Sequence, residues 1–393
     1  MKSSSPTRLA MMIVAIAIAG LAATWAVGKV MSYYEQASKD SEASARVTDK
    51  MKTVCVGRFL VDMPNNAQVD LGSATIDGID LAAFKETEEE FHQRLADREA
   101  QISTLTDRLG GNKNLESVIT VSTDTGLVGK VFVHSRTVRE GTQGNGLGVE
   151  RYRYEGVTIE ALVHGKGVSV DLDSKDREPA WIDDVPELVK KLVVNPENRI
   201  PDEAGFCLDH AYVRDPLTAE QKEKITMSAD MPNHPDVQFL LIVAAGLKPD
   251  EEGLIERSHG ALRLRPFADR MRIRGLRAAP RNIGGLTGDE LVESISEGDN
   301  ITVQSFWWEV NGTRHDVANP HVALKMITGS GPHGPVPPSV SEGTAVALWD
   351  RVVPTFRLLA KEPHLSAGSR RGAVTRASRS DMRARARLVP AAQ

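Results

Sequence analysis

The sequence lacks the short motifs that accompany the common kinds of catalytic and cofactor site. Its 393 residues contain no Gly-x-Ser-x-Gly turn for a nucleophilic serine, no His-Glu-x-x-His zinc motif, no phosphate-binding glycine loop and no Cys-x-x-Cys pair. Glu88 and His92 are four residues apart, but a lone pair of this kind on a solvated helix is usually a surface ion pair. We therefore predict that the chain is not an enzyme and binds no metal, cofactor or small-molecule substrate.

Positive charge is also in deficit relative to negative charge over most of the chain, which argues against binding to nucleic acid. The net charge is −5, although residues 364–393 carry seven arginines and a single acid, Asp381. The remainder is therefore more acidic than the total, whereas nucleic acid is bound by a basic face. The tail at 361–393, rich in Ser, Ala, Gly and Arg, is typical of a disordered extension.

One uncharged stretch, residues 9–28, has the length of a membrane span. Twenty residues rise about 30 Å as a helix, which matches the hydrocarbon core of a bilayer. Lys2 and Arg8 precede it and favour a cytoplasmic N-terminus at residues 1–8. We expect an uncleaved transmembrane signal anchor, a polar tether at 29–50, and a single-pass inner-membrane protein with its body in the periplasm. A cleaved signal peptide is the alternative.

Two short segments of the remaining chain resemble each other. TVCVGRFLVDMP at 53–64 and GFCLDHAYVRDP at 205–216 each contain one of the only two cysteines, followed nine positions later by Pro. Glu155 and Glu309 then follow these cysteines by 100 and 102 residues. The pattern predicts a duplication, with a first domain at 51–200 and a second at 201–360.

Local patterns predict a mixture of helices and antiparallel strands in each domain. A capping box from Thr87 to Glu90 predicts a helix at about 88–103. The alternation of apolar and charged residues at 262–265 predicts a strand, and a second capping box at 287–290 predicts a short helix. The expected fold class is α+β: an N-terminal transmembrane helix followed by two similar α+β domains built on mainly antiparallel sheets.

The two cysteines predict a disulfide between the starts of the two domains. In an exported chain, Cys55 and Cys207 at matching positions of two repeats are good candidates for pairing. Loop-entropy models credit closure of so long a loop with about 5 kcal/mol. Two separate buried thiols remain the alternative.

The Cys55 segment, CVGRFLVDMP, resembles the opening of the Tli4-type immunity proteins of bacterial type VI secretion. The resemblance extends over about residues 50–360 and stops before the Arg-rich tail. It continues through 205–207, 234–237, 271–277, 285–288, 306–309 and 347–350. It implies a two-domain α+β protein of the cell envelope that binds and neutralises a cognate secreted phospholipase.

Three functions remain open from the sequence. The first is an inhibitor that clamps a lipase in a closed state, and its contacts are expected in two acidic clusters that can steer a basic partner. The second is an envelope hydrolase that uses carboxylates such as Glu155 and Glu309, and the third is a structural envelope scaffold. The candidate partner-binding residues are Glu88, Glu89, Glu90, Asp250, Glu251 and Glu252.

Overall fold

The computed structural model describes residues 49–106, 114–144, 146, 148–214, 221–298, 301–314 and 316–359, and five single positions between 31 and 42. The N-terminus at 1–8, the predicted anchor at 9–28 and the Arg-rich tail at 361–393 lie outside these residues, as does most of the tether at 29–50.

Within the described ranges, no helix is long and apolar enough to cross a membrane. The longest helix there, α2 (Glu88–Thr104), has 17 residues and carries three acidic side chains in its first turn. This finding corrects two predictions: a fold that begins with a transmembrane helix, and a single-pass protein of the inner membrane.

Strands dominate the described chain, and the helices between them are few. The first unit, residues 51–194, consists of β1 (Met51–Val56), β2 (Phe59–Pro64), β3 (Gln68–Leu71), β4 (Ala74–Ile76), β5 (Ile79–Lys85), α2, β6 (Leu115–Ser122), β7 (Val128–Gly144), β8 (Val149–Gly165), β9 (Val168–Arg177), the 3-10 helix η1 (Pro179–Trp181), α3 (Asp184–Lys191) and β10 (Leu192–Val194).

The second unit, residues 205–358, begins with another short hairpin. It consists of β11 (Gly205–Leu208), β12 (Ala211–Arg214), β13 (Glu223–Met231), β14 (His234–Ala245), α4 (Leu254–Leu264), α5 (Phe267–Arg270), β15 (Ile273–Ile283), β16 (Leu286–Ser296), β17 (Thr302–Val310), β18 (His321–Thr328), β19 (Ser330–Gly331), β20 (Gly334–Pro335), α6 (Glu342–Val352), the 3-10 helix η2 (Val353–Thr355) and β21 (Arg357–Leu358).

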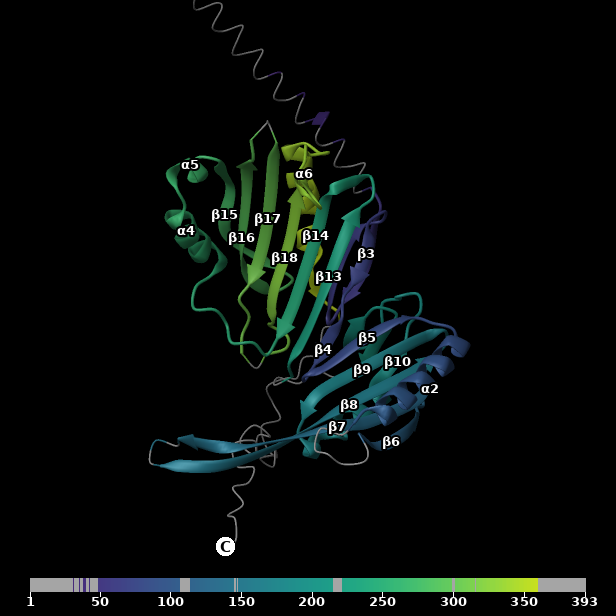
Figure 1. Cartoon of the computed structure of the whole chain (residues 1–393). Helices are drawn as coiled ribbons and strands as arrows, with labels where there is room; N and C mark the ends of the chain where they lie inside the picture. Colours follow the sequence, from purple (N-terminus) through teal and green to yellow (C-terminus); the bar gives the residue numbers. More distant parts are fainter. Residues whose placement is uncertain are drawn as a thin grey trace, which may run out of the picture.

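One long antiparallel sheet runs through both units (Figure 1). Its strand order is β15-β16-β17-β18-β14-β13-β4-β5-β9-β8-β7-β6, and β3 also pairs with β13. The units meet where β13 pairs with β4, through Glu223 opposite Ile76 and Lys224 opposite Thr75. The expectation of two similar α+β domains built on mainly antiparallel sheets is therefore corrected to a largely β fold with one shared antiparallel sheet.

The two units place their elements in the same order. Each starts with a hairpin, continues with sheet strands (three in the first unit, two in the second) and a helix, and ends with four more sheet strands, a second long helix and a short last strand. The second unit has α5, β19 and β20 in addition. In each unit the first of those four strands, β6 or β15, lies at the outer edge of the sheet. Helix α4 therefore takes the place in the second unit that α2 has in the first.

The short last strands are exchanged between the units. β10 of the first unit pairs with β12 of the second, and β21 of the second pairs with β2 of the first. The hairpins also touch each other, because Gly57 and Cys207 exchange two backbone hydrogen bonds of 3.0 and 2.8 Å. Each unit thus completes the small sheet of the other.

Helices cover both faces of the long sheet. On one face a single apolar core includes Val185 and Leu188 of α3 together with Leu348 and Trp349 of α6. On the other face α2 packs through a separate cluster around Phe91. Helix α4 lies on this same second face, since Arg257 of α4 binds Glu309, and the neighbour of Glu309, Trp308, points into the α6 core.

Local sequence patterns predict some of these elements correctly. The helix expected at 88–103 is confirmed, with Thr87 Oγ1 accepting a hydrogen bond from Glu90 N at 3.3 Å. The strand expected at 262–265 is wrong, because these residues form the end of α4. The helix expected at 287–290 is also wrong: this segment belongs to β16, which is bonded to β15 and β17 on its two sides.

Candidate functional site

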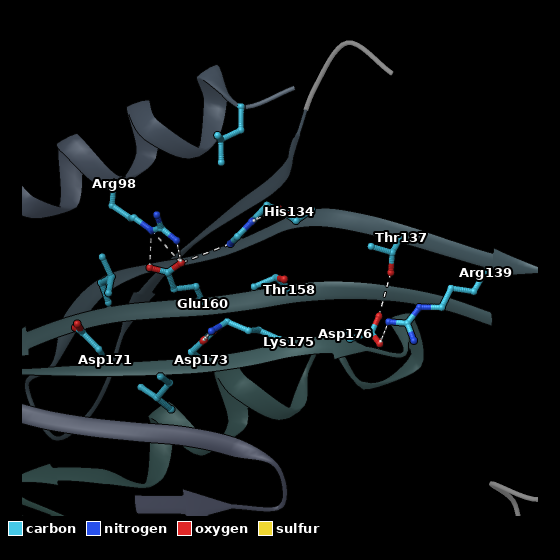
Figure 2. A pocket seen from close by; sticks show the side chains of 14 residues that line it. Arg98, His134, Thr137, Arg139, Thr158, Glu160, Asp171, Asp173, Lys175 and Asp176 are labelled. Carbon is cyan, nitrogen blue, oxygen red and sulfur yellow. Dashed lines mark hydrogen bonds and ion pairs between the residues drawn. The ribbon is translucent and has the colours of Figure 1, made fainter. Parts of the chain in front are cut away.

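A cavity of about 490 Å³ lies between the end of α2 and the strands β7, β8 and β9 (Figure 2). Its walls are charged. Arg98 comes from α2, His134 from β7, Glu160 from β8, and Asp173 and Lys175 from β9. The alternation of the three strands directs these polar side chains toward α2, whereas Ile159 and Ala161 enter the main core.

Glu160 is the most strongly perturbed acid of this cavity. Arg98 donates to both carboxylate oxygens, with Nε–Oε1 at 2.8 Å and Nη2–Oε2 at 2.6 Å, and His134 Nε2 lies 3.5 Å from Oε2. Burial raises the pKa of Glu160, but the hydrogen bonds from His134 and Arg98 and the charge of Arg98 outweigh it and lower the pKa to about 2. The carboxylate is therefore ionised at neutral pH.

The other acids of the cavity are also bound to cations. Lys175 Nζ lies 3.0 Å from Asp173 Oδ2, and Asp176 accepts from Arg139 at 2.5 Å and from Thr137 at 3.0 Å (Figure 2). Glu160, with its low pKa, is poorly suited to proton transfer near neutral pH. The arrangement instead attaches α2 to the sheet, as Arg94 does with Asp171 at 2.8 Å.

The two predicted acidic clusters are exposed, but they lie in different units. Residues 88–90 begin α2, where Thr87 hydrogen bonds lower the pKa of Glu90. Residues 250–252 lie in the loop before α4, the helix equivalent to α2, and Asp250 contacts Arg257 at 3.3 Å. The clusters therefore occupy matching places on one face of the sheet, well apart (Figure 1). Their role in partner binding stays a prediction.

The structure brings the two cysteines together. Cys55 and Cys207 are the second-to-last residues of β1 and β11, and their Sγ atoms form a disulfide of 2.12 Å. Both side chains are buried against Leu60 and the partly buried Tyr212. The bond joins the hairpins at the point where the units touch.

Glu155 and Glu309 are not brought together, and their spacing does not mark equivalent positions. Glu155 lies ten residues before the end of β8, and Glu309 lies one residue before the end of the equivalent strand β17. Glu155 binds Arg153 at 2.8 Å and Arg136 at 3.2 Å, while buried Glu309 binds Arg257 at 2.5 Å. Each carboxylate has its own arginine, so the geometry gives no support to a shared acid–base pair.

Sequence reasoning missed two surface features. Strands β7 and β8 have 17 residues each and project from the body as a two-stranded arm (Figure 1), and the only signal was the Gly-rich turn between them. The second feature is the exposed segment from Arg263 to Arg272. The alternation of Leu and Arg at its start led to the wrong prediction of a strand.

Two family models match the chain in succession. The model described as "Tle cognate immunity protein 4 N-terminal domain" matches residues 52–159, and the corresponding C-terminal domain matches residues 199–360. The chain belongs to the Tle cognate immunity protein 4 family. The resemblance to Tli4-type immunity proteins is thereby confirmed, and membership of this family indicates a non-enzymatic, inhibitory role.

Solved structures of immunity proteins share the fold of this family member. Immunity protein TplEi of the T6SS from Pseudomonas aeruginosa, complexed with an "L" peptide, has a TM-score of 0.60 at 22% identity, covering 79% of this chain and 99% of that one. The crystal structure of a Tle4–Tli4 complex gives 0.62 at 22% identity, with 78% and 97% covered. A comparison with curated proteins finds no match.

Proposed function

We propose that this chain binds a cognate phospholipase effector of the type VI secretion system and inhibits it by clamping it in a closed, inactive state. The observation that carries the proposal is the match of both units to the immunity-protein family. A solved relative forms a Tle4–Tli4 complex, which supports a protein partner.

The shared sheet supports a clamp made of two linked contact surfaces. Helices α2 and α4 lie on one face of the sheet, in equivalent places of the two units. The sheet junction, the exchanged strands and the disulfide fix their spacing. Once one unit contacts the effector, the second contact becomes intramolecular, which raises the overall affinity above that of either unit.

Inhibition by contact alone requires no chemistry from this chain. A lipase that acts at a membrane has to admit an acyl chain, and a partner that holds it closed prevents this by binding energy. Such energy is usually concentrated in a few aromatic and Arg side chains within a polar rim. The carboxylates of the cavity beneath α2 are bound to cations, which favours a structural role for them.

The disulfide favours an oxidising compartment such as the periplasm as the place of inhibition. Disulfides persist in the bacterial periplasm and are rare in the cytosol, where thiols are kept reduced. Cys55–Cys207 joins positions 152 residues apart in the sequence, so its loss would loosen the contact between the two hairpins.

A titration tests the proposed function. The purified chain is added in steps to the purified cognate effector while phospholipid hydrolysis is followed. We expect the activity to fall to its limit at about one chain per enzyme. An unrelated phospholipase, which should keep its activity, is the control. A cognate effector that stays fully active at excess chain would contradict the proposal.

A further inference from the structure

Three large apolar side chains of the second unit lie largely in solvent. Leu264 is 89% exposed, Phe267 69% and Met271 71%, and they fall within eight residues of one another at the end of α4, in α5 and just after it. We call these three residues and their flanking arginines the α4–α5 surface. A contiguous apolar surface with a polar rim usually marks an interaction site.

Arginines surround this apolar group, and three of the five form no ion pair with a described residue. Five arginines lie between positions 263 and 274, with Asp269 as the only acid. Arg274 binds Glu342, and Arg265 acts on Glu293 through its charge. Arg263, Arg270 and Arg272 form no ion pair with any described residue, although Arg270 lies over the Phe267 ring at 5.6 Å.

Helix α4 is attached to the sheet at its start, whereas its end carries the exposed side chains. Leu254 is buried at the start of this helix, and Arg257 one turn later is bound to Glu309. Pro266 then separates α4 from the four-residue helix α5, so the chain turns away from the sheet. In Figure 1 both helices lie at the outer margin of the sheet, beside β15 and β16.

A groove adjoins the α4–α5 surface. Its volume is about 500 Å³, and it runs from Met271 and Arg272 across the ends of β16 and β17 to Ser341, the N-cap of α6. A partner can therefore contact both the exposed apolar side chains and the lining of the groove beside them.

We infer that the α4–α5 surface docks onto an apolar area of the effector lipase that is rimmed by carboxylates. This inference rests on the proposed function and assigns the second unit's main contact to these residues. Aromatic side chains and arginines are the types most often found among energetically dominant interface residues. Arginines that form no ion pair with a described residue are available to attract an acidic rim.

The test uses the full chain and two double variants. Phe267→Ser with Met271→Ser removes the apolar part, and Arg270→Glu with Arg272→Glu reverses the charge. Both pairs are exposed, so we expect unchanged thermal unfolding. We expect the Kd for the cognate effector, measured by calorimetry, to rise at least tenfold in each. Ile200→Ser is the matched control, because Ile200 is 42% exposed but lies in the connection between β10 and β11, outside the surface and both acidic clusters, and its Kd should stay within about twofold.

Other occupants of the surface give different results. A Kd unchanged in both double variants, while the unsubstituted chain still inhibits the effector, overturns the inference and leaves the proposed function intact. The same result together with loss of binding to phosphatidylglycerol vesicles assigns the surface to lipid. If the Kd for the effector is unchanged and the variants lose a dimer that the unsubstituted chain forms in light scattering, the surface binds a second copy of the chain. An unsubstituted chain that does not bind the effector overturns the proposed function and the inference with it.

Discussion

Glu160 is the side chain whose charge contributes most clearly to stability. Its ordinary pKa of 4.5 falls to about 2 in the folded chain, so the ionised carboxylate stabilises the fold above pH 4.5. This contribution is lost as the pH falls from 4.5 toward 2. We expect Glu160→Gln to lower the free energy of unfolding at pH 7 by on the order of 2 kcal/mol, and the difference from the unsubstituted chain to shrink toward pH 3.

Denaturant unfolding at pH 7, 5 and 3 measures this effect. Glu155→Gln serves as the control, because its carboxylate is 35% exposed and its ion pairs lie in solvent, where such pairs contribute little. We expect that control to change the free energy of unfolding by less than about 0.5 kcal/mol at each pH. A Glu160→Gln effect that is constant across this pH range would contradict the assigned charge state.

At the scale of elements, the β7–β8 arm is the part that should be removable. Beyond its base it is a two-stranded ribbon, and such ribbons contribute little stability of their own. Replacing residues 141–152 with Asn-Gly keeps the Glu140–Arg153 ion pair and the Arg139–Asp176 ion pair. We expect the free energy of unfolding to change by less than about 1 kcal/mol, measured by denaturant titration. A loss of several kcal/mol would show that the arm supports the body.

The elements also show how far local patterns predict this fold. The capping box at Thr87 is reliable because both of its hydrogen bonds lie within four residues. The segment at 287–290 also has a Thr followed three residues later by a Glu, but its pairing with β15 and β17 outweighs this local preference for a helix. At 262–265 apolar and charged residues alternate as in a strand, although the segment is the end of a helix, because Leu264 is exposed to solvent there and not buried. The α4–α5 surface therefore becomes visible only with tertiary structure.

At the scale of the whole molecule, the disulfide joins two parts that are distant in sequence. Replacing both Cys55 and Cys207 with Ser removes a closure of 152 residues. We expect a loss of up to about 5 kcal/mol in the free energy of unfolding, since loop-entropy models give this order. The measurement is denaturant unfolding, and non-reducing peptide mapping of the unsubstituted chain checks the bond. Two free thiols there, or a double variant of equal stability, would contradict the prediction.

The continuity of the long sheet was beyond reach from sequence. In the long sheet the units join through two residue pairs of β13 with β4 and four of β13 with β3, and no local pattern states which strand an edge will pair with. The correspondence of Cys55 and Cys207 could be predicted from the sequence, because each cysteine lies one residue before the end of the first hairpin strand of its unit. The spacing of Glu155 and Glu309 misled because the arm lengthens β8 and shifts Glu155 away from the strand end.

The exchange of β10 and β21 has a consequence for biosynthesis. β21, the last strand described, at residues 357–358, completes the small sheet begun by β1 at residue 51. A nascent chain therefore carries an open strand edge on its first hairpin until nearly all of it has been made. Prematurely ended products keep that edge unpaired and expose Phe59, which otherwise stacks on Phe356 at 4.9 Å. Exposed apolar surface and open edges promote aggregation. Only complete chains should therefore protect the cell, whereas fragments should aggregate.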